Sequence, residues 1–234
     1  MLKLGVPSKG RLMEQTFDWF GARGVTLRRS GSEREYAGHV EGLAGLDLVL
    51  LSAGEIPREL AGGRIHLGVT GSDLIRDKLV DWDAQVTELA ALGFGHADLV
   101  IAVPAAWVDV ATLDDLDAVA AAFRRTHGQR LRIATKYHRL VREFLTENGV
   151  ADYQLVDSQG ATEGTVKNLT AEAIADITSS GATMKANHLK ILDDGLIHHS
   201  QATLFAARAA DWDVTASVTY RALASCLGLP GQPF

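Results

Sequence analysis

A loop of small polar residues has the composition most suggestive of chemistry. It follows an apolar stretch that ends in Asp176, and it consists of Thr178, Ser179, Ser180, Gly181, Ala182 and Thr183. A helix is predicted to begin there, and the first amides of a helix lack intrahelical partners and carry partial positive charge. Such a loop binds a phosphate group, and a preceding acid accepts hydrogen bonds from sugar hydroxyls. A plain Ser/Thr helix cap is the alternative, but the acid and the density of small polar residues favour a 5-phosphoribosyl site.

Two cations lie on a tight turn after the first predicted strand. The segment Gly5-Val-Pro-Ser-Lys-Gly-Arg-Leu places Lys9 and Arg11 where a helix begins. It lacks the Lys-Ser/Thr pair of a P-loop, because Arg11 and Leu12 stand there. Cations at a helix N-terminus oppose the helix dipole, so a bound diphosphate explains them better than a solvated surface does.

Two further strand–helix junctions are weaker candidates. Gly71 and Asp73 lie in Leu67-Gly-Val-Thr-Gly-Ser-Asp-Leu, where a helix cap and a ligand contact are equally good explanations. Glu163 follows another strand end, as a weak base, a hydroxyl acceptor or a helix cap. The eight histidines show no metal-binding spacing, and the single Cys226 excludes an intrachain disulfide or a cysteine-cluster metal site.

Short apolar runs alternate with amphipathic stretches and position these loops. Strands are predicted at 2–6, 46–51, 66–69, 97–103, 131–134, 153–156, 172–177 and 197–206. Helices are predicted at 12–23, 56–61, 73–79, 112–125, 137–147, 163–168, 183–192 and 218–227. This alternation predicts a mostly parallel sheet covered by helices.

The order of these elements predicts two α/β domains. The first comprises residues 1–93 and 197–234, and the second comprises residues 94–196, inserted into the first and carrying the phosphoribosyl loop. Two chain crossings place a cleft between the domains, and such clefts are the usual ligand site of α/β proteins.

The overall composition narrows the class of protein. The 234 residues are 47% hydrophobic and 22% charged, which is typical of a globular chain and not of a disordered segment or a coiled coil. A net charge of -6 argues against a nucleic-acid partner. No apolar run approaches the ~18 residues of a membrane span, and the N-terminus lacks the pattern of a signal peptide. We therefore expect a cytoplasmic protein without a membrane partner.

Five segments, in order along nearly the whole chain, resemble the ATP phosphoribosyltransferase family. They are Ser8-Lys-Gly-Arg-Leu, Gly54-Glu-Ile-Pro, Leu67-Gly-Val-Thr-Gly-Ser-Asp-Leu, Ile133-Ala-Thr-Lys-Tyr and Asp176-Ile-Thr-Ser-Ser-Gly-Ala-Thr-Met-Lys-Ala-Asn. The resemblance implies a two-domain fold similar to that of type II periplasmic binding proteins. It implies transfer of the 5-phosphoribosyl group of phosphoribosyl pyrophosphate to N1 of ATP, with Mg2+ carried mainly by the substrate phosphates.

The resemblance also implies roles and partners. The loop from Asp176 to Thr183 would hold the ribose and its 5-phosphate, and Lys9, Arg11 and Arg34 would hold pyrophosphate or ATP phosphates. The length resembles the short form of the family, which works as a homodimer within a hetero-oligomer with a regulatory subunit similar to histidyl-tRNA synthetase.

Three positions depart from the family pattern. Ser52 stands where the family often has arginine, and Arg58 is a candidate replacement. The segment before Glu163 differs from the usual one, which weakens the transfer of a role to Glu163. Ser180 replaces a common threonine but keeps the hydroxyl.

Two other functions are open. One is a cytoplasmic small-anion binding module of the same fold, which gives no reason for both the Lys9-Gly-Arg11 turn and the Asp176 loop. The other is a different phosphoribosyltransferase. The common nucleobase enzymes resemble one another in two adjacent acids before the phosphate loop, whereas Ala175 precedes Asp176 here.

Overall fold

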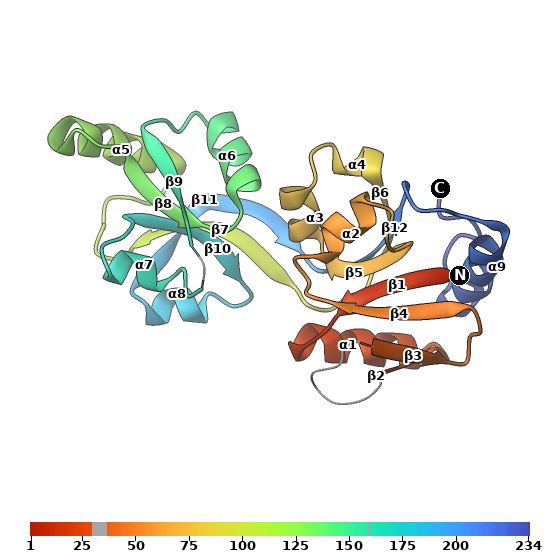
Figure 1. Cartoon of the computed structure of the whole chain (residues 1–234). Helices are drawn as coiled ribbons and strands as arrows, with labels where there is room; N and C mark the ends of the chain where they lie inside the picture. The colour runs from red at the N-terminus through yellow and green to blue at the C-terminus, as the bar shows by residue number, and fades with distance from the viewer. Residues whose placement is uncertain (30–36, 159) are drawn as a thin grey trace. The chain divides into compact units, whose positions relative to one another are not determined.

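A computed structural model describes residues 1–29, 37–158 and 160–234 of the chain (Figure 1). These residues form two compact units, Met1–Gly95 with Gln201–Phe234, and His96–Ser200. The second unit thus begins at residue 96 and ends at residue 200, whereas the sequence suggested 94 and 196. The reason is the pairing of the two connecting strands, because Ser200 still lies opposite Ala97 in the sheet of the second unit.

In the described part of the chain, unit 1 contains a seven-stranded sheet with the order β2-β3-β4-β1-β5-β12-β6. Its strands are β1 (Leu2–Pro7), β2 (Thr26–Arg29), β3 (Ala37–Glu41), β4 (Leu46–Leu51), β5 (Leu67–Gly71), β6 (Val86–Ala91) and β12 (Ala202–Ala207). The helices are α1 (Gly10–Gly21), α2 (Ile56–Ala61), α3 (Ser72–Lys78), α4 (Trp82–Gln85) and α9 (Val214–Leu227).

Within the described residues, unit 2 contains a five-stranded sheet with the order β11-β7-β10-β8-β9. Its strands are β7 (Ala97–Pro104), β8 (Leu131–Thr135), β9 (Tyr153–Asp157), β10 (Ala173–Thr178) and β11 (Leu189–Ser200). The helices are α5 (Leu113–His127), α6 (His138–Glu147), α7 (Gly164–Lys167) and α8 (Ala182–Ala186). Thr112 and Asp115 form a capping box at the start of α5.

Both sheets are mixed, so the expectation of a mostly parallel sheet was wrong. Strand β1 is parallel to β4 and β5, and β8 is parallel to β9 and β10. The remaining pairs are antiparallel, including β2 with β3 and β12 with β5 and β6. Strands β2 and β3 were not predicted because their sequences, TLRR and AGHVE, contain few apolar residues.

The region after the phosphoribosyl loop also differs from the prediction. The helix expected at 183–192 ends at Ala186, because His188 has a left-handed backbone with φ 57° and Leu189 starts β11 opposite Pro104. The single strand expected at 197–206 is the end of β11 followed by β12. Gln201 separates them, where the chain passes from the sheet of one unit to the sheet of the other.

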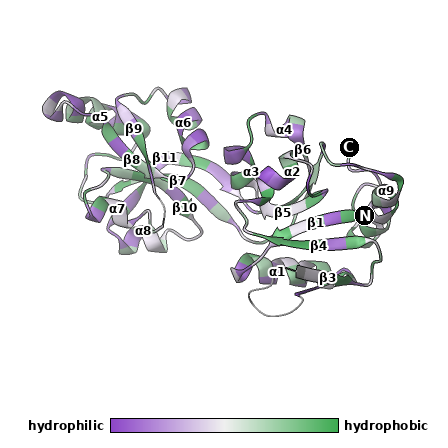
Figure 2. Ribbon diagram, viewed as in Figure 1, coloured by the Kyte–Doolittle hydropathy of each residue, from purple (hydrophilic) through white to green (hydrophobic). Residues whose placement is uncertain are grey.

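The strands carry the hydrophobic core of each unit. In unit 1, Leu2, Leu4 and Val6 of β1 are fully buried and belong to a cluster with Phe20 of α1 and Tyr220 of α9. Figure 2 shows green stretches along the strands and mixed green and purple on helices such as α1 and α5, which is the pattern of helices with one face in solvent. No helix in the described ranges is both long and apolar enough to span a membrane.

Candidate functional site

The phosphoribosyl-type loop, residues 176–183, begins at the end of β10. This strand lies inside the unit 2 sheet, between β7 and β8. The apolar run before it is fully buried, which fixes the strand in the sheet. Asp176 is also buried, with 7% of its surface exposed, and its Oδ1 accepts a hydrogen bond of 2.9 Å from the Ile177 amide. The acid is therefore held rigidly at the point where the strand turns into the loop.

The loop itself is shaped by its own hydroxyls. Thr178 Oγ1 accepts a hydrogen bond of 2.8 Å from the Gly181 amide, and Ser180 Oγ accepts one of 3.4 Å from the Ala182 amide. Gly181 has φ 72°, a left-handed conformation that favours glycine, and it precedes the five-residue helix α8. The structure thus brings the predicted loop residues together, and Ser179, Ser180, Ala182 and Thr183 are exposed.

A second polar region lies in unit 1, after the carboxyl ends of the neighbouring parallel strands β1 and β4. It is a cavity of about 770 Å³. Its polar lining comes from Ser8, Lys9, Glu14, Arg29, Ser52 and Glu55. Gly10 lies in the same lining and has φ 73°, which lets the chain turn sharply from Lys9 into α1.

The cavity is lined by one of the predicted cations and by a second cation that the sequence did not reveal. Lys9 lines it, whereas Arg11, in the first turn of α1, is exposed and is not among the described lining residues. Arg29 lines it from the end of β2, a strand too short and polar to be recognised in the sequence. The predicted Arg34 lies outside the described residues.

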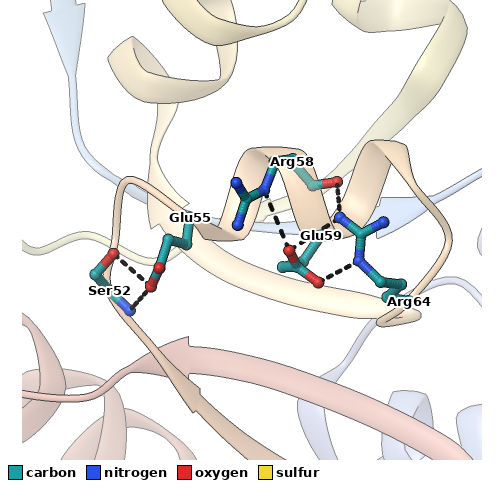
Figure 3. Close-up of polar contacts among 5 residues, drawn as sticks. All are labelled: Ser52, Glu55, Arg58, Glu59 and Arg64. Carbon is teal, nitrogen blue, oxygen red and sulfur yellow. Dashed lines mark hydrogen bonds and ion pairs between the residues drawn. The ribbon is translucent and has the colours of Figure 1, made fainter.

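Figure 3 shows the polar contacts around the family departure at Ser52. Glu55 Oε2 accepts hydrogen bonds from the Ser52 amide (3.0 Å) and the Ser52 hydroxyl (2.8 Å). These two bonds hold the pKa of the exposed Glu55 carboxyl below its usual value. The sequence therefore places a neutral hydroxyl and an anchored carboxylate in the cavity at this position.

Arg58 has a different environment from Ser52. Its Nε donates to Glu59 Oε1 over 3.3 Å, and Glu59 also pairs with Arg64 at 2.9 Å (Figure 3). The Arg58 side chain is 73% exposed and is not among the described residues that line the cavity. Arg29 is thus the described arginine that does line it.

The remaining predicted residues lie at two other strand–helix junctions. Gly71 ends β5, and Asp73 is buried in the first turn of α3, where a carboxylate interacts favourably with the helix dipole. Glu163 is half-buried at the start of α7 and its side chain makes no capping hydrogen bond. Before it, the buried Ser158 and Thr162 hydroxyls lie 3.0 Å apart, while Gln159 lies outside the described residues.

An ion pair joins β8 to Glu172, the residue just before β10, the strand that leads into the phosphoribosyl-type loop. Arg132 donates from Nε to Glu172 at 3.1 and 3.2 Å, and the Arg132 amide donates to the same carboxylate at 2.8 Å. Burial raises the pKa of Glu172, but the hydrogen bonds and charge of Arg132 outweigh it and hold this pKa below the usual value.

Glu172→Gln should therefore destabilise the protein by about 1 to 2 kcal/mol at neutral pH. Because the folded pKa is lowered, the contribution is complete above the ordinary value of about 4.3 and is lost as the pH falls through the folded value. Urea unfolding of wild type and variant at several pH values measures it. A stability difference that stays constant from neutral to strongly acidic pH would contradict this assignment.

Comparisons with known proteins identify the family of the chain. A family model described as "HisG: ATP phosphoribosyltransferase" matches residues 52–224. An ATP phosphoribosyltransferase of Cereibacter sphaeroides is 76% identical over 229 residues, which are 98% of this chain and 97% of that protein. Another, from Rhodopseudomonas palustris strain BisB18, is 52% identical over 94% of this chain and 68% of that protein.

Solved structures show the same fold at low sequence identity. The "ATP phosphoribosyl transferase (HisG:HisZ) complex from Thermotoga maritima" matches with a TM-score of 0.74 and 21% identity, over 97% of this chain and 96% of that chain. The probable amino-acid ABC transporter extracellular-binding protein ytmK of Bacillus subtilis matches with a TM-score of 0.51 and 10% identity, over 97% and 92%. The predicted similarity to periplasmic binding proteins is thereby confirmed.

Proposed function

Because the chain belongs to the ATP phosphoribosyltransferase family and so carries out the first step of histidine biosynthesis, we propose which of its residues serve each part of that reaction. In this step the 5-phosphoribosyl group of phosphoribosyl pyrophosphate is transferred to N1 of ATP, and pyrophosphate is released. The observation that carries the assignment of residues is the rigid Asp176 carboxylate beside an exposed loop of hydroxyls and amides.

The 176–183 loop binds the phosphoribosyl group in this proposal. Exposed hydroxyls of Ser179, Ser180 and Thr183 and the amides around Gly181 supply donors to the 5-phosphate. Asp176 accepts hydrogen bonds from the ribose hydroxyls, since an ionised carboxylate has only acceptors. Support comes from the burial of Asp176 and from the left-handed Gly181, which together give the loop one defined conformation.

The phosphates at the other end of the reaction are assigned to cations of unit 1. Lys9 lines the cavity together with Arg29, so both bind pyrophosphate or ATP phosphates in this proposal. Arg11, in the first turn of α1, also binds these phosphates. The same role is proposed for Arg34, which lies outside the described residues. Gly71 and Asp73 contact ATP, and Glu163 accepts a hydrogen bond from a substrate hydroxyl or serves as a weak base.

These assignments follow from the charge changes of the reaction. Displacing pyrophosphate from ribose C1 builds positive charge on the sugar ring and negative charge on the leaving group. Lys9 stabilises the leaving group, and Asp176 orients the ring and faces its positive charge. Adenine N1 is a neutral nucleophile, so the chain does not need an activated serine or cysteine.

Magnesium fits this donor set as an ion carried by the substrate. Mg2+ typically binds one or two carboxylates plus substrate phosphates, and Glu14 and Glu55 bring two carboxylates to the cavity. Among the described residues, no group of three or more metal-ligating side chains lies together. When bound to the phosphates, Mg2+ would neutralise part of the leaving group's charge.

The partner and the location are part of the same proposal. The similar Thermotoga maritima structure is a complex of HisG with HisZ. We infer that this chain likewise works with a regulatory subunit, similar to histidyl-tRNA synthetase, as a homodimer within a hetero-oligomer in the cytoplasm. Co-purification with such a subunit and the mass of the assembly in solution test this part.

Replacing Arg11 by alanine should lower turnover about tenfold and leave the fold intact. Arg11 is exposed and directly follows the cavity residue Gly10, so the loss should come from phosphate contacts. Steady-state kinetics and a thermal melt measure both properties. Turnover equal to that of wild type would reject the role of Arg11.

The reaction is tested by incubating the purified chain with ATP, phosphoribosyl pyrophosphate and Mg2+, with and without the regulatory subunit. Phosphoribosyl-ATP is detected by mass and pyrophosphate by a coupled assay. Product in either condition supports the proposal. Folded protein that binds phosphoribosyl pyrophosphate but yields no product in both conditions would favour a binding module, and product only with a free nucleobase would favour another phosphoribosyltransferase.

A further inference from the structure

We infer that His199, held by Asp98, binds the diphosphate end of phosphoribosyl pyrophosphate in unit 2. This inference rests on the proposed function of the 176–183 loop and adds two residues to it. Neither residue belongs to the motifs that the sequence singled out, and both lie on the strands that begin and end unit 2, β7 and β11.

The sheet register places three polar residues in one row. Strand β7 lies between β10 and β11, and Asp98 is directly opposite both Thr178 of β10 and His199 of β11. Residues directly opposite one another in a sheet point to the same face. His199 Nδ1 and Asp98 Oδ1 are 2.8 Å apart, so these two side chains meet on this face. His199 lies about 10 Å from Thr178, which is two strand spacings.

A second acid completes the pattern. Asp176 precedes Thr178 by two residues and therefore points to the same face of β10. It is opposite Val100, two residues from Asp98 along β7. From the loop outward, this face thus carries phosphate donors, then the carboxylates Asp176 and Asp98, and then the imidazole of His199.

This order matches the groups of a ribose 5-phosphate that carries a diphosphate at C1. The loop donors suit the 5-phosphate, the Asp176 carboxylate suits the ribose hydroxyls, and the imidazole held by Asp98 suits the diphosphate at the other end of the sugar. A phosphate bound directly beside the Asp98 carboxylate would be repelled by its negative charge. Nε2 of His199 avoids this, because it lies on the side of the ring away from Nδ1, the atom that Asp98 contacts.

The arrangement of Asp98 and His199 also suits an anionic ligand. Asp98 Oδ1 fixes the ring through Nδ1, which leaves Nε2 to face an anionic oxygen of the ligand. The side chains are 75% exposed for His199 and 47% exposed for Asp98, so their pairing alone contributes little to stability. An exposed pair is available to a ligand.

The chain offers a matched control on the same strand. His198 is opposite Leu99 and therefore points to the other face of the sheet. Replacing His198 removes an imidazole from β11 without touching the row. His199→Ala, His199→Arg and Asp98→Asn then test the row itself, and Asp98 acts in this scheme as a positioning residue for His199.

The probes are pyrophosphate alone and ribose 5-phosphate alone, each titrated with Mg2+ into the full chain by calorimetry. His199→Ala should weaken pyrophosphate binding about tenfold and leave ribose 5-phosphate binding within about twofold of wild type. The KM for phosphoribosyl pyrophosphate should rise by the same factor, and the KM for ATP should stay unchanged. His199→Arg should recover most of the loss, Asp98→Asn should show part of it, and His198→Ala none.

Two results would overturn the inference. Pyrophosphate binding by His199→Ala equal to that of wild type would show that the pair only joins β7 to β11. An equal loss for both probes, or a loss in His198→Ala as well, would show a general disturbance of the sheet. If wild type makes no phosphoribosyl-ATP, the proposed reaction fails, but the pyrophosphate titrations still decide the role of His199.

Discussion

Lys9→Ala is expected to lower kcat/KM about 100-fold, which corresponds to about 2.7 kcal/mol of transition-state stabilisation. Lys9 is the lysine that lines the cavity at the end of β1, and its charge would act on the leaving pyrophosphate. The side chain is exposed and the backbone before α1 is extended, so alanine fits without strain. Steady-state kinetics with both substrates gives the effect.

Lys3 provides the matched control for this experiment. It is an exposed lysine near the start of the same strand, and the contact it makes with His66 Nδ1 uses its backbone amide, which alanine keeps. Lys3→Ala should therefore retain wild-type kinetics. If Lys9→Ala and Lys3→Ala behave alike, Lys9 does not act on the substrate phosphates.

Asp176→Asn is expected to have the larger effect, a loss of about 100- to 1000-fold in kcat/KM for phosphoribosyl pyrophosphate. Asparagine keeps the shape and can still accept the bond from the Ile177 amide, so the loop conformation should survive. What is lost is a buried negative charge that orients the ribose and faces the positive charge on its ring. Activity assays together with a thermal melt separate the lost charge from a lost fold.

Asp193→Asn is the control for that substitution. Asp193 is an exposed acid on β11 of the same unit, and its hydrogen bond to Ala111 uses the backbone amide. Its replacement should leave both the kinetics and the melting temperature near wild type. If Asp176→Asn keeps more than half of the wild-type kcat/KM, Asp176 does not bind the substrate.

Local sequence patterns predicted most elements because each pattern has a direct physical cause. The runs at 46–51 and 56–61 match β4 and α2 residue for residue, since an apolar run interrupted only by Asp47 fits a strand and Pro57 fits the first turn of a helix. The Asp176 loop was visible because an apolar strand, an acid, a glycine and several hydroxyls follow one another within a short segment.

Patterns failed where partners in space decide the structure. Strands β2 and β3 are polar and form through pairing, so Arg29 was not recognised as a cavity residue. The helix after Thr183 stops early because Leu189 pairs with Pro104 across the sheet, which outweighs its helix propensity. The antiparallel return of β12 beside β5 likewise depends on long-range pairing.

The sequence by itself determined the family, the two α/β units and the loop that is proposed to hold the phosphoribosyl group, because these depend on residues close together in the chain. Only the tertiary structure decided that Lys9 and Arg29 line one cavity and that Asp98 joins His199 across 101 positions of sequence. Such contacts arise from sheet register, which brings distant residues to the same face and is not encoded in any local segment.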